Sequence, residues 1–286
     1  MVSRKAAQVS PSPTLAIDSK FKEMKANGVD VVGFGCGEPD FDTPDHIKEA
    51  AIAAIMRGET KYTPAAGTLK LRKAVADKFL RENSLEYKPT DIVVSNGAKH
   101  SLINAFTAIL NPGDEVLIPA PYWVSYPEMV KLADGVPVTV DTKEEDEFKV
   151  TTELLEAALT PKTKALVINS PSNPTGMVYT EAELRAVADF AVKHDLYVIS
   201  DEIYEHLIYE GKHISIASFG EEIKKRTVVV NGVSKTFAMT GWRIGYAAAN
   251  PEIAKAMANI QSHASSFPNS IAQEAEYAAL EGGMEA

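Results

Sequence analysis

Lys235 and Arg243 are two cationic residues that lie close together, just after the strand-like run at 226–231. Small residues, including Gly232 and Ser234, surround the lysine. A lysine in a desolvated pocket or near another cation has a pKa below about 10.4, and its neutral amine can form a Schiff base with an aldehyde. An arginine is suited to binding a phosphate. The pair therefore predicts a site for a phosphorylated aldehyde such as pyridoxal 5′-phosphate (PLP), with an ordinary surface loop as the alternative.

The elements that would position these residues alternate between strands and helices. Hydrophobic runs predict strands at 31–34, 91–95, 115–118, 136–140, 164–169, 196–200, 227–231 and 244–249. Helical periodicity predicts helices at 14–27, 44–58, 69–83, 102–110, 125–133, 152–159, 181–194, 251–262 and 268–280. This alternation predicts an α/β fold, in which a mainly parallel sheet has helices on both faces.

Candidate ligand-binding residues follow most of the predicted strands. Ligands of open α/β sheets bind at the carboxyl ends of the strands. The residues found there are Gly97, Trp123, Asn173, Asp201 and Lys235. Side chains that are scattered along the sequence thus map to one edge of one sheet, which is stronger evidence for a site than any single motif.

The turn 96–101 follows a predicted strand, opens a predicted helix, and contains Gly97, Ala98 and Lys99. A helix N-terminus that follows a small-residue turn is typical of an anion site, because free backbone N–H groups and the helix dipole attract negative charge. An ordinary strand–helix turn is the alternative for this segment taken alone. Together with Arg243, the turn predicts a phosphate-binding cup.

Asp201 ends the predicted strand 196–200, and Tyr204 follows it. A carboxylate at this edge can bond a protonated pyridine nitrogen, and two unit charges about 4 Å apart interact by about 4 kcal/mol at an effective dielectric of about 20. This contact would keep the ring cationic and able to accept electrons. A helix N-cap is the alternative role for Asp201. Asn173 can donate from its amide to a phenolic oxygen or a carboxylate, although Asn-Pro is also ordinary turn chemistry.

The overall composition excludes several classes of protein. The 286 residues carry 29 basic and 39 acidic side chains, a formal charge of −10, which disfavours nucleic acid or an anionic membrane as a partner. The sequence contains no run of 18 apolar residues. Its one cysteine, Cys36, cannot form an intrachain disulfide, so we expect a reducing compartment and a cytoplasmic location. We expect Cys36 itself to be a buried apolar residue. We assign no metal ligands.

Three segments resemble a known family. The stretch 232–245, which reads Gly-Val-Ser-Lys-Thr-Phe-Ala-Met-Thr-Gly-Trp-Arg-Ile-Gly, is similar to the lysine signature of the class I aminotransferases, the fold-type-I PLP enzymes. The Asn-Pro-Thr-Gly loop that begins at Asn173 and the Gly-Glu-Pro segment that begins at Gly37 match the same family. The resemblance runs from about Ser10 to the last residue, and it is strongest to the bacterial and plant aspartate aminotransferase branch, which includes aspartate/prephenate enzymes.

The resemblance implies roles for these residues. Lys235 would hold PLP and then carry a proton between the substrate and the cofactor. Asp201 would bond the ring nitrogen, Tyr204 and Asn173 the phenolic oxygen, and Trp123 would stack on the ring. The phosphate would be bound by Gly97, Ala98, Lys99, Ser234 and Arg243. The substrate would contact Gly37, Trp123 and Asn173, and Thr14 and Lys99 match positions linked to side-chain carboxylate and prephenate recognition. Tyr62 would reach the phosphate of the neighbouring subunit, which implies a homodimer.

The sequence departs from the family at two points. Gly232 stands where many relatives carry serine, which removes one hydroxyl contact to the phosphate. The family also has a C-terminal arginine for the substrate carboxylate, roughly a hundred residues beyond Ala286. We therefore expect a fragment: an arm and part of the small domain at 1–43, a PLP-binding large domain at 44–286 that ends in the linking helix, and no C-terminal small domain.

The predicted function is transfer of the amino group of aspartate or glutamate to a 2-oxo acid, with prephenate as a further acceptor. One alternative is an aminotransferase of aromatic or alanine-type specificity. Another is a non-catalytic PLP-binding domain of a transcription regulator, although no helix-turn-helix precedes the fold. We also predict cis peptides at Ala120–Pro121 and Asn173–Pro174, because both precede residues that must face the cofactor and the family has cis bonds there.

Overall fold

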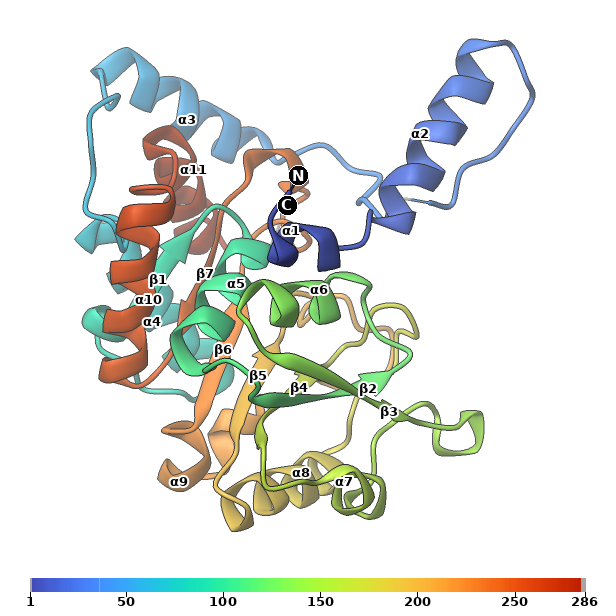
Figure 1. Ribbon diagram of the computed structural model, residues 1–286. Coiled ribbons are helices and arrows are strands. Elements are labelled where there is room, and N and C mark those ends of the chain that lie inside the picture. Colours follow the sequence, from blue (N-terminus) through green and yellow to red (C-terminus); the bar gives the residue numbers. More distant parts are fainter. Residues whose placement is uncertain (1, 36, 284–286) are drawn as a thin grey trace.

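A computed structural model of the protein describes residues 2–35 and 37–283 (Figure 1). The strands in these residues form one seven-stranded sheet in the order β1-β7-β6-β5-β4-β2-β3. Their bounds are β1 (Ile92–Ser95), β2 (Glu115–Ala120), β3 (Val136–Asp141), β4 (Thr163–Asn169), β5 (Tyr197–Asp201), β6 (Thr227–Asn231) and β7 (Gly245–Ala248). Only β7 runs antiparallel to its neighbours β1 and β6. The predicted mainly parallel sheet is confirmed.

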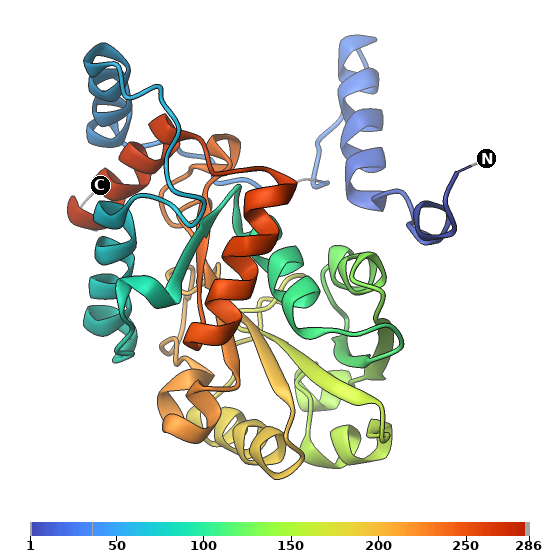
Figure 2. The ribbon, with the colours of Figure 1, turned by 60° about the vertical axis from the view of Figure 1, so that its left-hand side comes forward.

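Helices cover both faces of the sheet (Figures 1 and 2). One face carries α5 (Ala98–Ile109), α6 (Ser125–Leu132) and α10 (Pro251–Ala264), and the other carries α4 (Leu69–Asn83), α7 (Thr152–Ala158), α8 (Glu181–Lys193) and α11 (Ser270–Glu281). Two further helices are α3 (Asp45–Arg57), which packs on α11, and the short α9 (Glu221–Lys224). Because both faces are covered, every residue of β1, β6 and β7 is buried.

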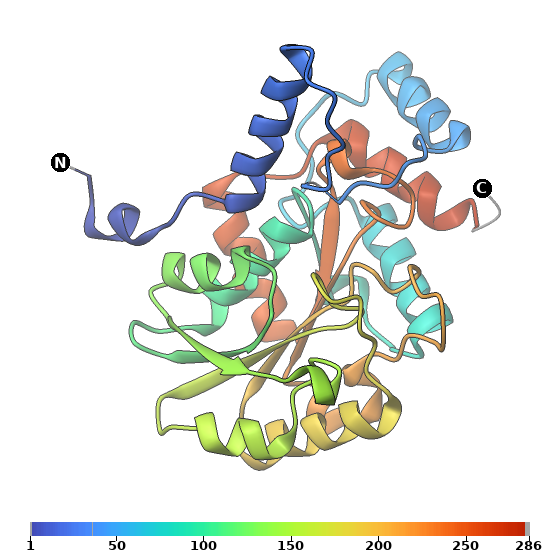
Figure 3. The ribbon, with the colours of Figure 1, turned by 90° about the vertical axis from the view of Figure 1, so that its right-hand side faces the viewer.

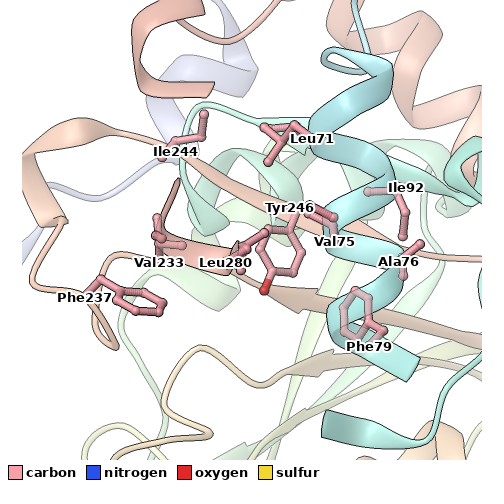
Figure 4. Close-up of a cluster of buried hydrophobic side chains, with 14 of the residues drawn as sticks. Leu71, Val75, Ala76, Phe79, Ile92, Val233, Phe237, Ile244, Tyr246 and Leu280 are labelled. Carbon is pink, nitrogen blue, oxygen red and sulfur yellow. The ribbon is translucent and has the colours of Figure 1, made fainter. Parts of the chain in front are cut away.

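Successive residues of a strand point to opposite faces, and the core follows this rule. Val228 and Val230 of β6 pack in the cluster beneath α5, α6 and α10. Val229 packs in the cluster on the other face, where Tyr246 meets Phe79 of α4 edge-on at 5.6 Å between ring centroids (Figure 4). The sheet is therefore held between two apolar layers, which fixes the positions of its strand ends.

The N-terminal segment stands apart from the sheet. It contains α1 (Arg4–Gln8), which contacts α6, and α2 (Pro13–Ala26), which projects from the body of the molecule and has no buried residue (Figures 1 and 3). The predicted strand at 31–34 is wrong: these residues have no regular structure. No neighbouring strand lies beside them in the described sheet, and an isolated apolar run cannot complete its backbone hydrogen bonds as a strand.

Two local predictions have outcomes in the same structure. The predicted cis bonds at Ala120–Pro121 and Asn173–Pro174 are both confirmed, and Ser170–Pro171 is a further cis bond. Cys36 lies outside the described residues. Across residues 2–35 and 37–283, the helices are too short or too polar to cross a membrane.

Candidate active site

The carboxyl end of the sheet gathers the predicted residues. Asn169 ends β4 and pairs in register with Asp201 at the end of β5, and Asp201 in turn pairs with Val230 of β6. The loop after β6 carries Lys235. Parallel pairing of neighbouring strands is the reason that these side chains meet, as the strand-end argument predicts.

Asp201 is held in one orientation by two donors. The Tyr126 hydroxyl donates to Oδ2 at 2.7 Å, and the backbone N–H of Ile203 donates to Oδ1 at 3.3 Å. Burial raises the pKa of Asp201 to about 6, because desolvation outweighs these hydrogen bonds, so the group is ionised at neutral pH. A turn, and not a helix, follows Asp201, which rules out the helix N-cap alternative. The carboxylate is thus a buried, oriented anion.

Asn173 and Tyr204 lie together beside Asp201. The Asn173 amide donates to the Tyr204 hydroxyl at 3.5 Å. Asn169 positions this loop, since its Nδ2 donates to the backbone carbonyl of Asp201 at 2.9 Å and its Oδ1 accepts from the Asn173 N–H at 2.7 Å. Two polar groups therefore meet at one point beside Asp201.

Lys235 lies between Tyr204 and the N-terminal segment. Its Nζ is 5.7 Å from the centroid of the Tyr204 ring and donates to the backbone carbonyl of Gly37 at 2.6 Å. Gly37 is exposed, and Lys235 is partly buried. The amine is thus fixed at the edge of the site by an acceptor from a distant part of the chain.

The N-terminus of α5 and Arg243 are in direct contact. Gly97 has a φ of +87°, and a Cβ built there would lie 2.6 Å from the Arg243 guanidinium. A Cβ at Gly245 would lie 2.7 Å from the backbone N of Ala98. Partial burial, and then the charge of Arg243, lower the pKa of Lys99. Two cations converge on a helix N-terminus, an arrangement that fits a doubly charged phosphate group.

Gly97→Ala is expected to weaken phosphate binding about tenfold or more. The new methyl group would displace the Arg243 guanidinium, and alanine is also strained at positive φ. Titration of the purified protein with PLP, with or without competing inorganic phosphate, measures the loss. Gly113→Ala is the matched control, because Gly113 has a φ of +88° but a Cβ there would meet no atom within 4 Å. Equal affinities in the two variants would contradict the contact argument.

Trp123 follows the carboxyl end of β2 and is half-buried. Its ring packs edge-on against Tyr126 at 5.4 Å between centroids, and the Lys99 amine lies 4.7 Å from the centroid of the Trp123 ring. Ser234 is buried next to Lys235. Trp123 therefore lies between Lys99 and Tyr126, the residue that orients Asp201.

Two predicted residues lie elsewhere. Tyr62 is 92% exposed, and its ring packs edge-on against Phe267 at 5.3 Å. Thr14 lies in the first turn of α2, the helix that projects from the body (Figure 3). Sequence reasoning assigned no role to Tyr126 or Asn169. The end of β4 next to Asp201 could have indicated Asn169, whereas no local signal identified Tyr126.

The fold and these side chains define an α/β enzyme of the aminotransferase class. Residues 29–285 match the family described as aminotransferase class I and II. The chain belongs to this family.

Relatives and solved structures agree with this assignment. The chain is 54% identical over 285 residues to an aspartate aminotransferase of Bacillus subtilis, covering 99% of this chain and 72% of the relative. It is 52% identical over 279 residues to the aspartate/prephenate aminotransferase of Thermus thermophilus, with 98% and 72% coverage. The structure of a Thermus thermophilus aspartate aminotransferase with maleate matches with a TM-score of 0.96 at 51% identity, covering 99% of this chain and 73% of that one.

Proposed function

We propose that the protein is a PLP-dependent aminotransferase that moves the amino group of aspartate or glutamate to a 2-oxo acid. The observation that carries this proposal is the single sheet edge on which Lys235, the buried Asp201 carboxylate and the Gly97–Arg243 cup lie together. Relatives that are 52–54% identical carry the names aspartate or aspartate/prephenate aminotransferase. Their names support an acidic substrate and, more narrowly, prephenate.

The residues present fit PLP. The α5 N-terminus with Ala98, Lys99 and Arg243 would bind its phosphate, and Asp201 would accept a hydrogen bond from its ring nitrogen. Asn173 and Tyr204 would bond its phenolic oxygen. When bound, the cofactor supplies an aldehyde for the amino group and an electron-accepting ring.

Side chains of the protein would carry out proton transfer, orient the groups and exclude water. The Lys235 Nζ, once released from the cofactor, would take a proton from the substrate Cα and return it on the cofactor side as general base and acid. Asp201 would keep the ring nitrogen protonated, and Tyr126 would keep the Asp201 carboxylate oriented. Trp123 would cover the ring and exclude water. Gly37 and Asn173 would orient the substrate carboxylate.

A homodimer with composite sites is part of the proposal. Tyr62 is exposed by 92%, as a residue that reaches a neighbouring subunit must be. Residues 1–43 are proposed as an arm that belongs with the small domain, because α2 buries no residue against the body. A cytoplasmic location is proposed from the single cysteine.

The test is a half-reaction that separates enzyme from binder. PLP-loaded protein should absorb as a yellow species, and aspartate should bleach it with release of the oxo acid; 2-oxoglutarate should restore it. A binding domain would keep its colour. A panel of amino donors decides between acidic and aromatic preference. An aromatic preference is the competing proposal for the substrate. The structure of an aromatic aminotransferase from Pyrococcus horikoshii matches with a TM-score of 0.86 at 48% identity, covering 91% of this chain and 70% of that one.

Lys99→Ala is expected to lower kcat/KM for aspartate and glutamate about tenfold more than kcat/KM for alanine. One charge-assisted hydrogen bond to a side-chain carboxylate is worth about 1.5–3 kcal/mol, whereas a weaker hold on the phosphate affects all donors alike. The motivation is the Lys99 amine beside Trp123 and Arg243, where it can face a side-chain carboxylate. Steady-state rates with the three donors measure the effect. Equal losses for all three donors would show that Lys99 serves the phosphate or the fold, and not specificity.

A further inference from the structure

The turn after β5 and the loop after β6 carry the two halves of the candidate site. Asp201 and Tyr204 lie on the turn, and Lys235 lies on the loop. Strand pairing holds Asp201 against Val230, but it stops at the strand ends. The position of the loop relative to the turn must therefore depend on contacts outside the sheet.

Glu205 and Asn231 form a buried bridge between these two segments. Asn231, the last residue of β6, donates from Nδ2 to Glu205 Oε1 at 2.7 Å and accepts at Oδ1 from the Gly232 N–H at 2.7 Å. Glu205 is 7% exposed and Asn231 is 1% exposed. One amide thus joins the turn that carries Asp201 to the first peptide of the loop that carries Lys235.

Lys78 and Asn83 of α4 hold the other side of the bridge. The Lys78 amine contacts Glu205 Oε1 and lies 2.9 Å from Asn83 Oδ1, and the Asn83 amide donates to Glu205 Oε2 at 2.9 Å. Burial alone raises the pKa of Glu205, but the charge of Lys78 and the hydrogen bond from Asn83 outweigh it, so the pKa of Glu205 is lowered. The carboxylate therefore accepts on both oxygens as a fixed anion.

A cavity of about 290 Å³ lies beside the bridge. Its lining includes Lys78, Glu205, Gly232, Thr236 and Phe237. Protein interiors are normally close-packed, and side chains that border a cavity lose the contacts that would hold them in place. Apolar packing holds the rest of the loop, since Val233 is 1% exposed and belongs to the buried cluster. On the side that faces the cavity, the polar bridge is a directional contact that adds to this packing.

We propose that Glu205 and Asn231 are positioning residues that set the Lys235 loop relative to Asp201, with Lys78 as the counter-ion. The catalytic consequence rests on the proposed function, whereas the effect on loop order does not. Sequence reasoning placed none of these three residues in the site. Their action is indirect, because each touches the loop or its support and none touches the reacting groups.

Asn231→Ala tests the bridge in the PLP-loaded protein. Removing both hydrogen bonds of the amide is expected to speed amide hydrogen exchange over residues 232–239 at least about tenfold and to lower kcat by a similar factor, with KM for the amino donor changed by less than about threefold. Arg226→Met is the control, since Arg226 pairs with Asp195 at 2.7 Å at the amino end of the same strand. It should leave exchange over 232–239 and kcat unchanged.

A second variant covers the case in which Asn231→Ala does not fold. Lys78→Met with Glu205→Leu removes the acceptor without leaving a buried unpaired charge, and such replacements are often neutral for stability. A folded protein with a lower melting temperature is expected, because the Asn83 and Asn231 amides lose their acceptor, together with faster exchange over 232–239 and lower kcat. Wild-type exchange and kcat in the folded variants would overturn the proposal. If the variants exchange faster over 232–239 but the wild-type protein itself has no transaminase activity, the proposed function is overturned and the bridge is still supported.

Discussion

Lys235→Ala is expected to lower transamination by at least about 10⁴-fold and to abolish covalent attachment of PLP. The substitution removes the amine that would bind the aldehyde, and it also removes the proposed acid–base group, which alone contributes about 10²–10⁴-fold. The Lys235 Nζ is held by the Gly37 carbonyl at 2.6 Å, at the edge of the candidate site. Borohydride reduction of the loaded protein followed by peptide mass spectrometry locates the attachment, and coupled assays measure turnover.

Lys255→Ala is the matched control for this prediction. Lys255 is an exposed lysine on α10, which follows the end of the antiparallel strand β7 and lies away from the carboxyl ends of β5 and β6. This variant should be labelled and should turn over like the wild type. Persistent covalent labelling of the Lys235→Ala protein would show that another lysine holds the cofactor and would sink the assignment.

Asp201→Asn is expected to lower kcat by about 10²–10³-fold with little change in KM for the amino donor. The charge of Asp201 would stabilise a protonated ring nitrogen by about 4 kcal/mol at a distance of about 4 Å and an effective dielectric of about 20, and asparagine keeps the shape but not the charge. Steady-state kinetics measure both constants. A large rise in KM with unchanged kcat would mean that Asp201 serves binding alone.

The pH profile supplies a second readout for the same residue. Burial raises the pKa of Asp201 to about 6, so the wild-type group is neutral below that pH and ionised above it. The affinity of the cofactor-free protein for PLP should therefore fall as the pH drops through about 6, and Asp201→Asn should lose this limb. Asp195→Asn is the control: Asp195 is exposed at the opposite end of the sheet, so its variant should keep both the rate and the limb.

The sequence alone determined the sheet and the strand-end residues. Apolar periodicity is a local property, and strands such as 227–231 are buried on both faces, so each predicted run from residue 91 onward identified a strand. Parallel strands then share one carboxyl edge, which brought Asp201 and Lys235 together without any knowledge of their contacts. The chemistry of an anion site, and not the strand-end argument, paired Gly97 with Arg243, and their direct packing is visible only in the fold.

Tertiary structure decided the partners of these residues. Tyr126 donates to Asp201, the Gly37 carbonyl accepts from Lys235, and Glu205 bridges to Asn231. Each of these contacts joins segments that are distant in sequence, and a hydroxyl or carboxylate carries no local signal of the partner it will meet. The segment 31–34 has the composition of a strand but no strand beside it, because pairing depends on the sheet edge that the rest of the chain leaves open.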